Sequence, residues 1–284
     1  DPLGPPDGDD VQVVADDGAR LAASIVGAAG GGPTVVLSHC WTGGRAVWAP
    51  VARRLVEGGH RVVLYDQRGH GRSERGAAPL TVDVLGDDLR AVVEQLDVRD
   101  AVLAGHSMGG MSVMSLACRR PDVVRARARG LALVATAAHG ITAGRLEPVA
   151  RRVLRAGLLE RALARPGGVL LLRSVVGEVV VRGHLELVRE LFLATPADVR
   201  SDCFAAMCAM DLRAGLAEID MPVTVMVGTH DTLTREPLGR AIAGLVPGSR
   251  VEVLPGAGHM LPLERPDAVA AAIGSLAARV SDAA

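Results

Sequence analysis

The stretch Gly105-His106-Ser107-Met108-Gly109-Gly110 decides how this chain folds and which chemistry it can support. An apolar run at 101–104 precedes it, and a helical pattern over Met108–Arg119 follows it. A G-x-S-x-G run between a strand and a helix is typical of a nucleophile elbow, a sharp turn that strains the serine and tolerates only small neighbours. The Ser107 hydroxyl is then expected to project from the carboxyl edge of a sheet. The backbone N–H of Met108, at a helix N-terminus, is expected to point to where an oxyanion forms.

A serine hydroxyl is a weak nucleophile, so the elbow predicts a general base and an acid that orients it. For this elbow the expected chain order is serine, acid, histidine. Asp231 and His259 each follow a late predicted strand, at the sheet edge where sites form. The other seat for the acid, residues 135–139, holds Ala-Thr-Ala-Ala-His and offers no carboxylate. We therefore expect a triad of Ser107, Asp231 and His259.

Short apolar runs alternate with helical patterns, which predicts an α/β fold with a doubly wound, mostly parallel sheet of eight strands. Asp16-Asp17-Gly18 is a hairpin signal that makes the first two strands an antiparallel edge. Between 138 and 212 helical patterns occur without strands, so we expect a helical cap there. The core domain is then 11–137 and 213–284, after a flexible leader at 1–10. The predicted strands are Val11–Val14, Leu21–Val26, Thr34–Leu37, Arg61–Tyr65, Ala101–Ala104, Leu131–Val134, Val223–Val227 and Val251–Leu254.

These motifs together resemble the α/β-hydrolase superfamily, in its esterase, lipase and thioesterase branch, over nearly the whole chain. They are specific for the fold and the triad, and they are not specific for a substrate. The stretches that carry the resemblance are His39–Trp41, Asp66–Ser73, Gly105–Gly110, Gly228–Asp231 and Gly258-His259 followed by Glu264-Arg265-Pro266.

The resemblance implies that the backbone N–H of Trp41 joins that of Met108 in the oxyanion hole. It also implies that Asp66–Ser73 is a structural loop that supports the site. The family usually has glycine at the position of Cys40, and a side chain there restricts the backbone and narrows the site. Cys40 as a reactive thiol is the alternative. Trp41 can wall the acyl pocket or simply pack under the cap.

The composition excludes several classes of function. The chain has 284 residues with 49% hydrophobic and 22% charged residues, which describes a folded protein rather than a disordered one. All of its basic residues are arginine, so Schiff-base lysine chemistry is excluded. A formal net charge of −1 does not favour nucleic acid as a partner. No apolar run approaches the roughly 18–20 residues that span a bilayer, so no stable membrane insertion is expected.

The cysteines match no zinc pattern, and we expect them to be reduced thiols. Reduced thiols favour a reducing compartment and hence a cytoplasmic location. The chain begins with Asp1 rather than Met, so removal of an upstream signal or anchor segment is an open alternative. No cofactor and no metal are expected.

The nucleophile narrows the chemistry. Related dehalogenases and epoxide hydrolases carry aspartate at the elbow, so Ser107 indicates acyl transfer to water through an acyl-enzyme. The predicted cap is rich in apolar residues, which favours a small-molecule ester with a lipophilic acyl group; the cap's own core is the alternative explanation. The open alternatives on the same triad are a thioesterase, a lactonase, a carbon–carbon bond hydrolase and a cofactor-free perhydrolase, with a non-catalytic binding protein as another class. The expected substrate contacts are Cys40, Trp41, His106 and Met260.

Overall fold

A computed structural model of the chain describes residues 4, 6–27, 32–141, 147–178 and 181–281. Within them the sheet has eight strands in the order β1-β2-β4-β3-β5-β6-β7-β8. β1 and β2 run antiparallel at one edge, β2 is also antiparallel to β4, and the other pairs are parallel. The eight-stranded, mostly parallel sheet predicted from the sequence is thereby confirmed. The strands are β1 (Gly8–Val14), β2 (Arg20–Val26), β3 (Val35–Ser38), β4 (Val62–Tyr65), β5 (Ala101–His106), β6 (Ala128–Val134), β7 (Val223–Gly228) and β8 (Arg250–Leu254).

The starts of β1 and β6 differ from the prediction by three residues, and the other strand bounds agree to within two residues. β1 begins at Gly8 because residues 8–10 pair with residues 24–26 of β2, so the expected leader over 1–10 was wrong for 8–10. Residues 1–3 and 5 of that leader lie outside the described residues. β6 begins at Ala128 rather than at Leu131, because its first residues extend the parallel ladder with β5.

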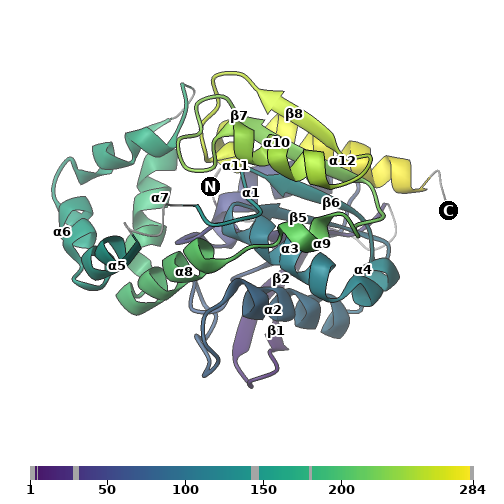
Figure 1. Ribbon diagram of the computed structural model, residues 1–284, viewed down its shortest axis with the longest axis horizontal. Coiled ribbons are helices and arrows are strands. Elements are labelled where there is room, and N and C mark those ends of the chain that lie inside the picture. Colours follow the sequence, from purple (N-terminus) through teal and green to yellow (C-terminus); the bar gives the residue numbers. More distant parts are fainter. Residues whose placement is uncertain (1–3, 5, 28–31, 142–146, 179–180, 282–284) are drawn as a thin grey trace.

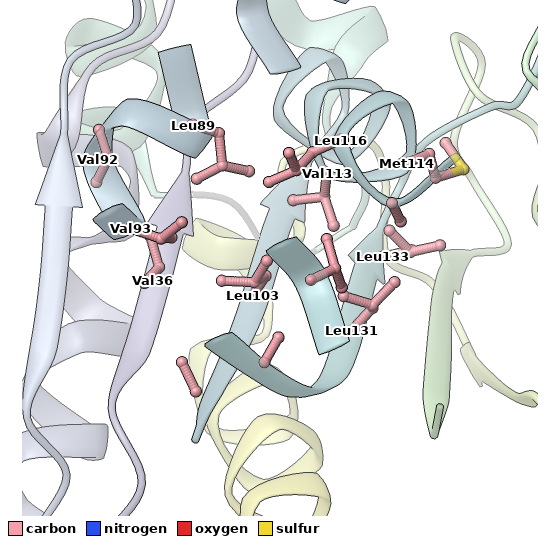
Figure 2. Close-up of a cluster of buried hydrophobic side chains, with 14 of the residues drawn as sticks. Val36, Leu89, Val92, Val93, Leu103, Val113, Met114, Leu116, Leu131 and Leu133 are labelled. Carbon is pink, nitrogen blue, oxygen red and sulfur yellow. The ribbon is translucent and has the colours of Figure 1, made fainter. Parts of the chain in front are cut away.

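Helices cover both faces of the sheet (Figure 1). α1 and α12 pack on one face, while α2, α3 and α10 pack on the other. Figure 2 shows part of the second interface, where Leu89 of α2 lies toward Leu116 and Val113 of α3, and Val93 of α2 lies beside Val36 of the sheet. The helices of this layered part are α1 (Ala49–Glu57), α2 (Val82–Gln95), α3 (Met108–Arg119), α4 (Pro121–Arg127), α9 (Arg213–Leu216), α10 (Glu236–Leu245), α11 (Leu261–Glu264) and α12 (Pro266–Ser281), with the 3₁₀ turn η1 (Arg45–Trp48) after β3.

The segment between β6 and β7 is helical and projects to one side of the sheet (Figure 1). Its helices are α5 (Glu147–Arg155), α6 (Leu158–Ala164), η2 (Gly168–Val175), α7 (Arg182–Ala194) and α8 (Ala197–Ala209). Val199, Cys203 and Met207 of α8 pack against Met108 and Met111 of α3, so this segment covers the carboxyl edge of the sheet. Its division from the core at 138 and 212 as a separate cap stays a prediction.

No helix within the described residues is long and apolar enough to cross a membrane. Cys40, Cys118 and Cys203 are thiols rather than disulfides.

Candidate active site

Ser107 lies on a strained turn between β5 and α3. Its φ of 54° and ψ of −115° place a non-glycine residue outside the conformations that side chains ordinarily adopt. A Cβ on Gly105 would come within 2.3 Å of the Gly109 carbonyl oxygen, and one on Gly109 within 2.2 Å of the Ser38 carbonyl oxygen. Larger residues at either position would clash with backbone, so the spacing of the motif follows from the turn itself. Ser107 keeps 6% of its surface exposed.

The loops after β7 and β8 bring Asp231 and His259 together. Asp231 Oδ2 accepts a hydrogen bond of 2.8 Å from His259 Nδ1. Asp231 Oδ1 accepts from the backbone N–H groups of Leu233 and Thr234, at 2.8 and 2.9 Å. The Thr234 hydroxyl donates to Asp231 Oδ2 at 2.7 Å and lies 3.2 Å from His259 Nδ1. Because Nδ1 is occupied by the carboxylate, Nε2 of His259 is the nitrogen left to face a reacting group.

The environment of Asp231 keeps it ionised. Burial alone would raise the pKa of its carboxyl, but the charge of His259 and the hydrogen bonds from His259 and Thr234 outweigh burial and hold the pKa well below its usual value. An ionised, hydrogen-bonded carboxylate fixes the tautomer of its histidine and stabilises the imidazolium that forms when the ring takes a proton.

The loop after β3, residues 39–44, runs beside the first turn of α3. The close approach of Gly109 to the carbonyls of Ser38 and His39 fixes that neighbourhood. This loop carries Trp41, while Met108 is the first residue of α3. The arrangement places the two residues expected to form an oxyanion hole on adjoining backbone segments; their role as donors stays a prediction.

Ser107 and His259 open onto one pocket of about 360 Å³. Its wall combines residues of the β3 loop, of α3 and of the helical segment. Among the described residues that line it, only Cys40 and His259 are titratable, and none is Arg, Asp or Glu. The apolar lining consists mainly of Trp41, Val47, Met111, Ile141, Leu159, Leu163, Leu171, Leu172, Val175, Val188, Leu191, Phe192, Phe204, Met207, Leu233 and Met260.

Three of the four expected substrate contacts, Cys40, Trp41 and Met260, line this pocket. His106 does not. Its ring is fully buried, with Nε2 2.8 Å from the carbonyl oxygen of His259 and its centroid 5.1 Å from the His259 ring. His106 ends β5, and its side chain is packed in the interior without lining the pocket. The expected substrate contact by His106 is therefore corrected to a place behind His259.

Burial also decides the chemistry of two of these neighbours. It lowers the pKa of His106 to about 3, which keeps that ring neutral. It raises the pKa of the Cys40 thiol to about 12, so a thiolate nucleophile at Cys40 is disfavoured.

Two residues of the site were not identified from the sequence. Thr234, three residues after Asp231, joins the acid and the base; a hydroxyl close behind an aspartate in a loop was the available signal. Glu264 is 5% exposed and accepts three backbone N–H groups: Gly258 at 2.8 Å, Met260 at 2.9 Å and Gly177 at 2.8 Å. It therefore holds both flanks of His259 and ties them to the end of the η2 segment. Its sequence signal was only its place in the Glu-Arg-Pro run.

The sequence and the fold are similar to those of known proteins. A model of the alpha/beta hydrolase family matches residues 35–272. The pimeloyl-[acyl-carrier protein] methyl ester esterase of Stenotrophomonas maltophilia is 28% identical over 268 residues, which cover 89% of this chain and 96% of the relative. The 3-oxoadipate enol-lactonase 2 of Acinetobacter baylyi is 30% identical over 213 residues, 73% of this chain and 74% of the relative. The crystal structure of an enol-lactonase from Burkholderia xenovorans superimposes with a TM-score of 0.81 at 27% identity, covering 94% of this chain and 99% of that one.

Proposed function

The chain belongs to the alpha/beta hydrolase family, and on that premise we propose that it is a serine hydrolase that cleaves carboxylic esters with an apolar acyl group. The observation that carries the proposal is that the strained Ser107 and His259, whose ring is hydrogen-bonded to Asp231, open onto one apolar pocket. The relatives named as a methyl ester esterase and an enol-lactonase support the reaction class.

In the proposed mechanism, Ser107 Oγ attacks the acyl carbon while His259 Nε2 takes the hydroxyl proton. The backbone N–H groups of Met108 and Trp41 stabilise the oxyanion, and one such donor typically contributes about 10²–10³ in rate. His259 then gives its proton to the leaving alkoxide, and an acyl-enzyme on Ser107 remains. Water, activated by His259, releases the acid and restores the serine.

The lining of the pocket supports a neutral, compact acyl group. A volume of about 360 Å³ lies at the small end of the range of roughly 300–1,000 Å³ for small-molecule sites. Without an Arg among the described lining residues, a carboxylate on the acyl group would be buried unpaired, which is costly. This argues against a dicarboxylic substrate such as the name 3-oxoadipate indicates for one relative. Uncharged lactones remain a second candidate, because a cyclic ester has the same reacting group.

The test is labelling with a fluorophosphonate, followed by intact mass measurement of the wild type and Ser107→Ala. We expect one adduct on the wild type and none on the variant. Hydrolysis of neutral carboxylic esters, thioesters, lactones and half-esters of dicarboxylic acids is then compared, and we expect the neutral oxygen esters to be best. A folded wild type that takes no adduct would contradict the proposal, and a preference for half-esters would contradict its account of the pocket.

A further inference from the structure

The aromatic residues of this chain are concentrated at its active-site pocket. The whole sequence contains two tryptophans, two phenylalanines and one tyrosine. Trp41, Phe192 and Phe204 all line the pocket, although they come from the loop after β3, from α7 and from α8. The Trp41 ring lies 6.0 Å from Phe192 at 86° and 5.9 Å from Phe204 at 45°. We call these three side chains the aromatic wall.

A buried arginine stands behind this wall. The side chain of Arg200, on α8, is 1% exposed, and its guanidinium carbon lies 4.7 Å from the centre of the Phe192 ring. Its N–H groups donate to the carbonyls of Phe192 at 2.7 Å and Thr195 at 2.8 Å, and it pairs with Glu160 of α6. A planar guanidinium can stack on a ring and bond several acceptors at once, which an ammonium cannot do equally well. Arg200 therefore joins α6, the end of α7 and α8 at one point.

The same residue reaches the β3 loop through its backbone. The indole Nε1 of Trp41 donates to the carbonyl oxygen of Arg200 at 3.0 Å. Trp41 is thus held at its polar end by α8 and on its ring by Phe192 and Phe204. The backbone of Trp41 belongs to the proposed oxyanion hole, so the pocket wall and the reacting edge share one residue.

We propose that Arg200 is a positioning residue that sets the aromatic wall and thereby selects the acyl group. The favoured class is a compact aromatic or arylalkyl acyl group, because rings held in fixed orientations interact with an aromatic partner through edge-to-face and offset-stacked contacts in addition to its buried area. A straight alkyl chain gains nothing from this geometry, because it presents no ring face or edge to the aromatic wall. The proposal rests on the proposed ester hydrolysis and adds to it the acyl class and the residue that sets it.

The experiment compares kcat and KM of the wild type, Arg200→Met and Arg200→Lys on nitrophenyl esters of phenylacetate, butanoate and octanoate. We expect the wild type to prefer phenylacetate. We expect Arg200→Met to lower kcat/KM for phenylacetate about tenfold, mainly through KM, and for butanoate less than threefold. Arg200→Lys is expected to recover part of the loss. Arg127→Met is the control. The Arg127 side chain donates to the carbonyl of Val98 and to the carboxylate of Asp97, so it also joins a backbone carbonyl and a carboxylate, but it lies at the amino edge of the sheet, opposite the pocket.

A double-mutant cycle tests whether Arg200 acts through Trp41. Trp41→Phe removes the Nε1 donor, keeps a ring and leaves the backbone N–H in place. If both residues act on one wall, the effects of Arg200→Met and Trp41→Phe on the acyl preference will not add. Should Arg200→Met fail to fold, the cycle is run with Arg200→Lys.

The outcomes separate the two proposals. A wild type without a fluorophosphonate adduct contradicts ester hydrolysis itself. A wild type that is labelled and hydrolyses esters, with an acyl preference that Arg200→Met and Arg127→Met leave equally unchanged, overturns the role of Arg200 alone. A wild-type preference for octanoate overturns the acyl class.

Discussion

Two loops flank Ser107, and they are held in place by opposite kinds of chemistry. The β3 loop, residues 39–44, is held by neutral imidazoles: His39 Nε2 accepts from the N–H of Gln67 at 2.9 Å, and His70 Nε2 accepts from the N–H of Thr42 at 3.2 Å. The loop after β8, which carries His259, is held by the carboxylate of Glu264 through the backbone N–H groups of Gly258 and Met260, and a third N–H, of Gly177, ties it to the helical segment. One side depends on groups that must stay uncharged, and the other on a buried carboxyl group.

Because of this difference, we expect the two loops to be weakened by different changes. Each imidazole that holds the β3 loop also uses its Nδ1, His39 toward the carbonyl of Cys40 at 2.8 Å and His70 toward that of Arg68 at 3.0 Å. With Nδ1 as the donor, Nε2 has a lone pair only while the ring is neutral. Protonation of either ring at low pH therefore removes a hydrogen bond that holds the β3 loop. The β8 loop is weakened instead by any change that removes a carboxylate oxygen.

The largest effect is expected from Glu264→Gln. Glutamine has the same size, but it replaces one oxygen by an NH₂ that faces a backbone N–H instead of accepting from it. Displacement of a reacting group by about 1 Å can cost roughly 10²-fold in rate, and we expect a loss of that order in kcat. The N–H groups left without an acceptor are expected to lower the free energy of unfolding by about 1–3 kcal/mol. Ester hydrolysis and urea unfolding measure the two losses.

Glu94→Gln is the matched control for Glu264→Gln. Glu94 forms an i,i+4 pair with Arg90 on α2, and no residue of α2 lines the pocket. Surface pairs of this kind contribute about 0.3–0.5 kcal/mol, so no change in kcat is expected. Equal kcat values for Glu264→Gln and the wild type would show that the β8 loop does not depend on the carboxylate, and the comparison of the loops would fail.

The neutral side is tested by pH. Burial lowers the pKa of His70 to about 3 and also lowers that of His39, from an ordinary value of 6.5. Between pH 3 and pH 6.5 the imidazole of His70 is protonated in the unfolded chain and neutral in the folded one. The unfolded chain therefore binds more protons, and the free energy of unfolding rises with pH over this range. This stabilisation is complete above pH 6.5 and is lost as the pH falls toward 3. Asp231 contributes in the same direction but only below its own ordinary value of 3.8.

The measurement is urea unfolding of the wild type and His70→Asn over this range of pH. Asparagine keeps one acceptor and one donor but does not titrate, so we expect the variant to be less stable at neutral pH and to have a flatter pH profile. Parallel profiles would assign the acid sensitivity to other groups. His106, whose pKa burial lowers to about 3, adds a slope that both proteins share.

The sequence predicted what local sterics and chain order determine. The elbow was predictable because a side chain at Gly105 would clash with the backbone only four residues further on, at Gly109, and α3 was predicted at its observed bounds, Met108–Arg119. The need for glycine at 109 comes instead from the distant backbone of Ser38. The groups that hold the site in place, Glu264 and Arg200, could not be predicted from the sequence. Glu264 acts on the N–H of Gly177, and Arg200 accepts from Trp41, across separations in the chain of 87 and 159 residues. Such partners are backbone atoms, which carry no residue-type signal.

A smaller effect is expected on the acid side of the triad, from Thr234→Val. Valine keeps the shape of threonine and removes the hydroxyl that donates to Asp231 Oδ2 at 2.7 Å. A hydrogen bond to a charged group contributes about 1.5–3 kcal/mol, and loss of the lower figure in the transition state corresponds to about tenfold in kcat. Because this bond helps to lower the pKa of Asp231, its loss is expected to raise that pKa. An unchanged kcat at every pH would mean that the backbone donors alone orient the acid.

The smallest effect, and one of opposite sign, is expected from Thr224→Val at the other end of β7. The Thr224 hydroxyl is buried, and it has no hydrogen-bond partner among the described residues. Burial of an unpaired hydroxyl costs about 1–3 kcal/mol by mutational measure, so its replacement by a methyl group is expected to raise the free energy of unfolding, by about 1 kcal/mol after imperfect repacking. Replacement of threonine by valine is thus expected to lower activity at position 234, where the hydroxyl bonds Asp231, and to stabilise the protein at position 224, where the hydroxyl has no partner among the described residues. Destabilisation by Thr224→Val would show that this strand tolerates no change of shape, and the loss in Thr234→Val would then have to be attributed to packing as well.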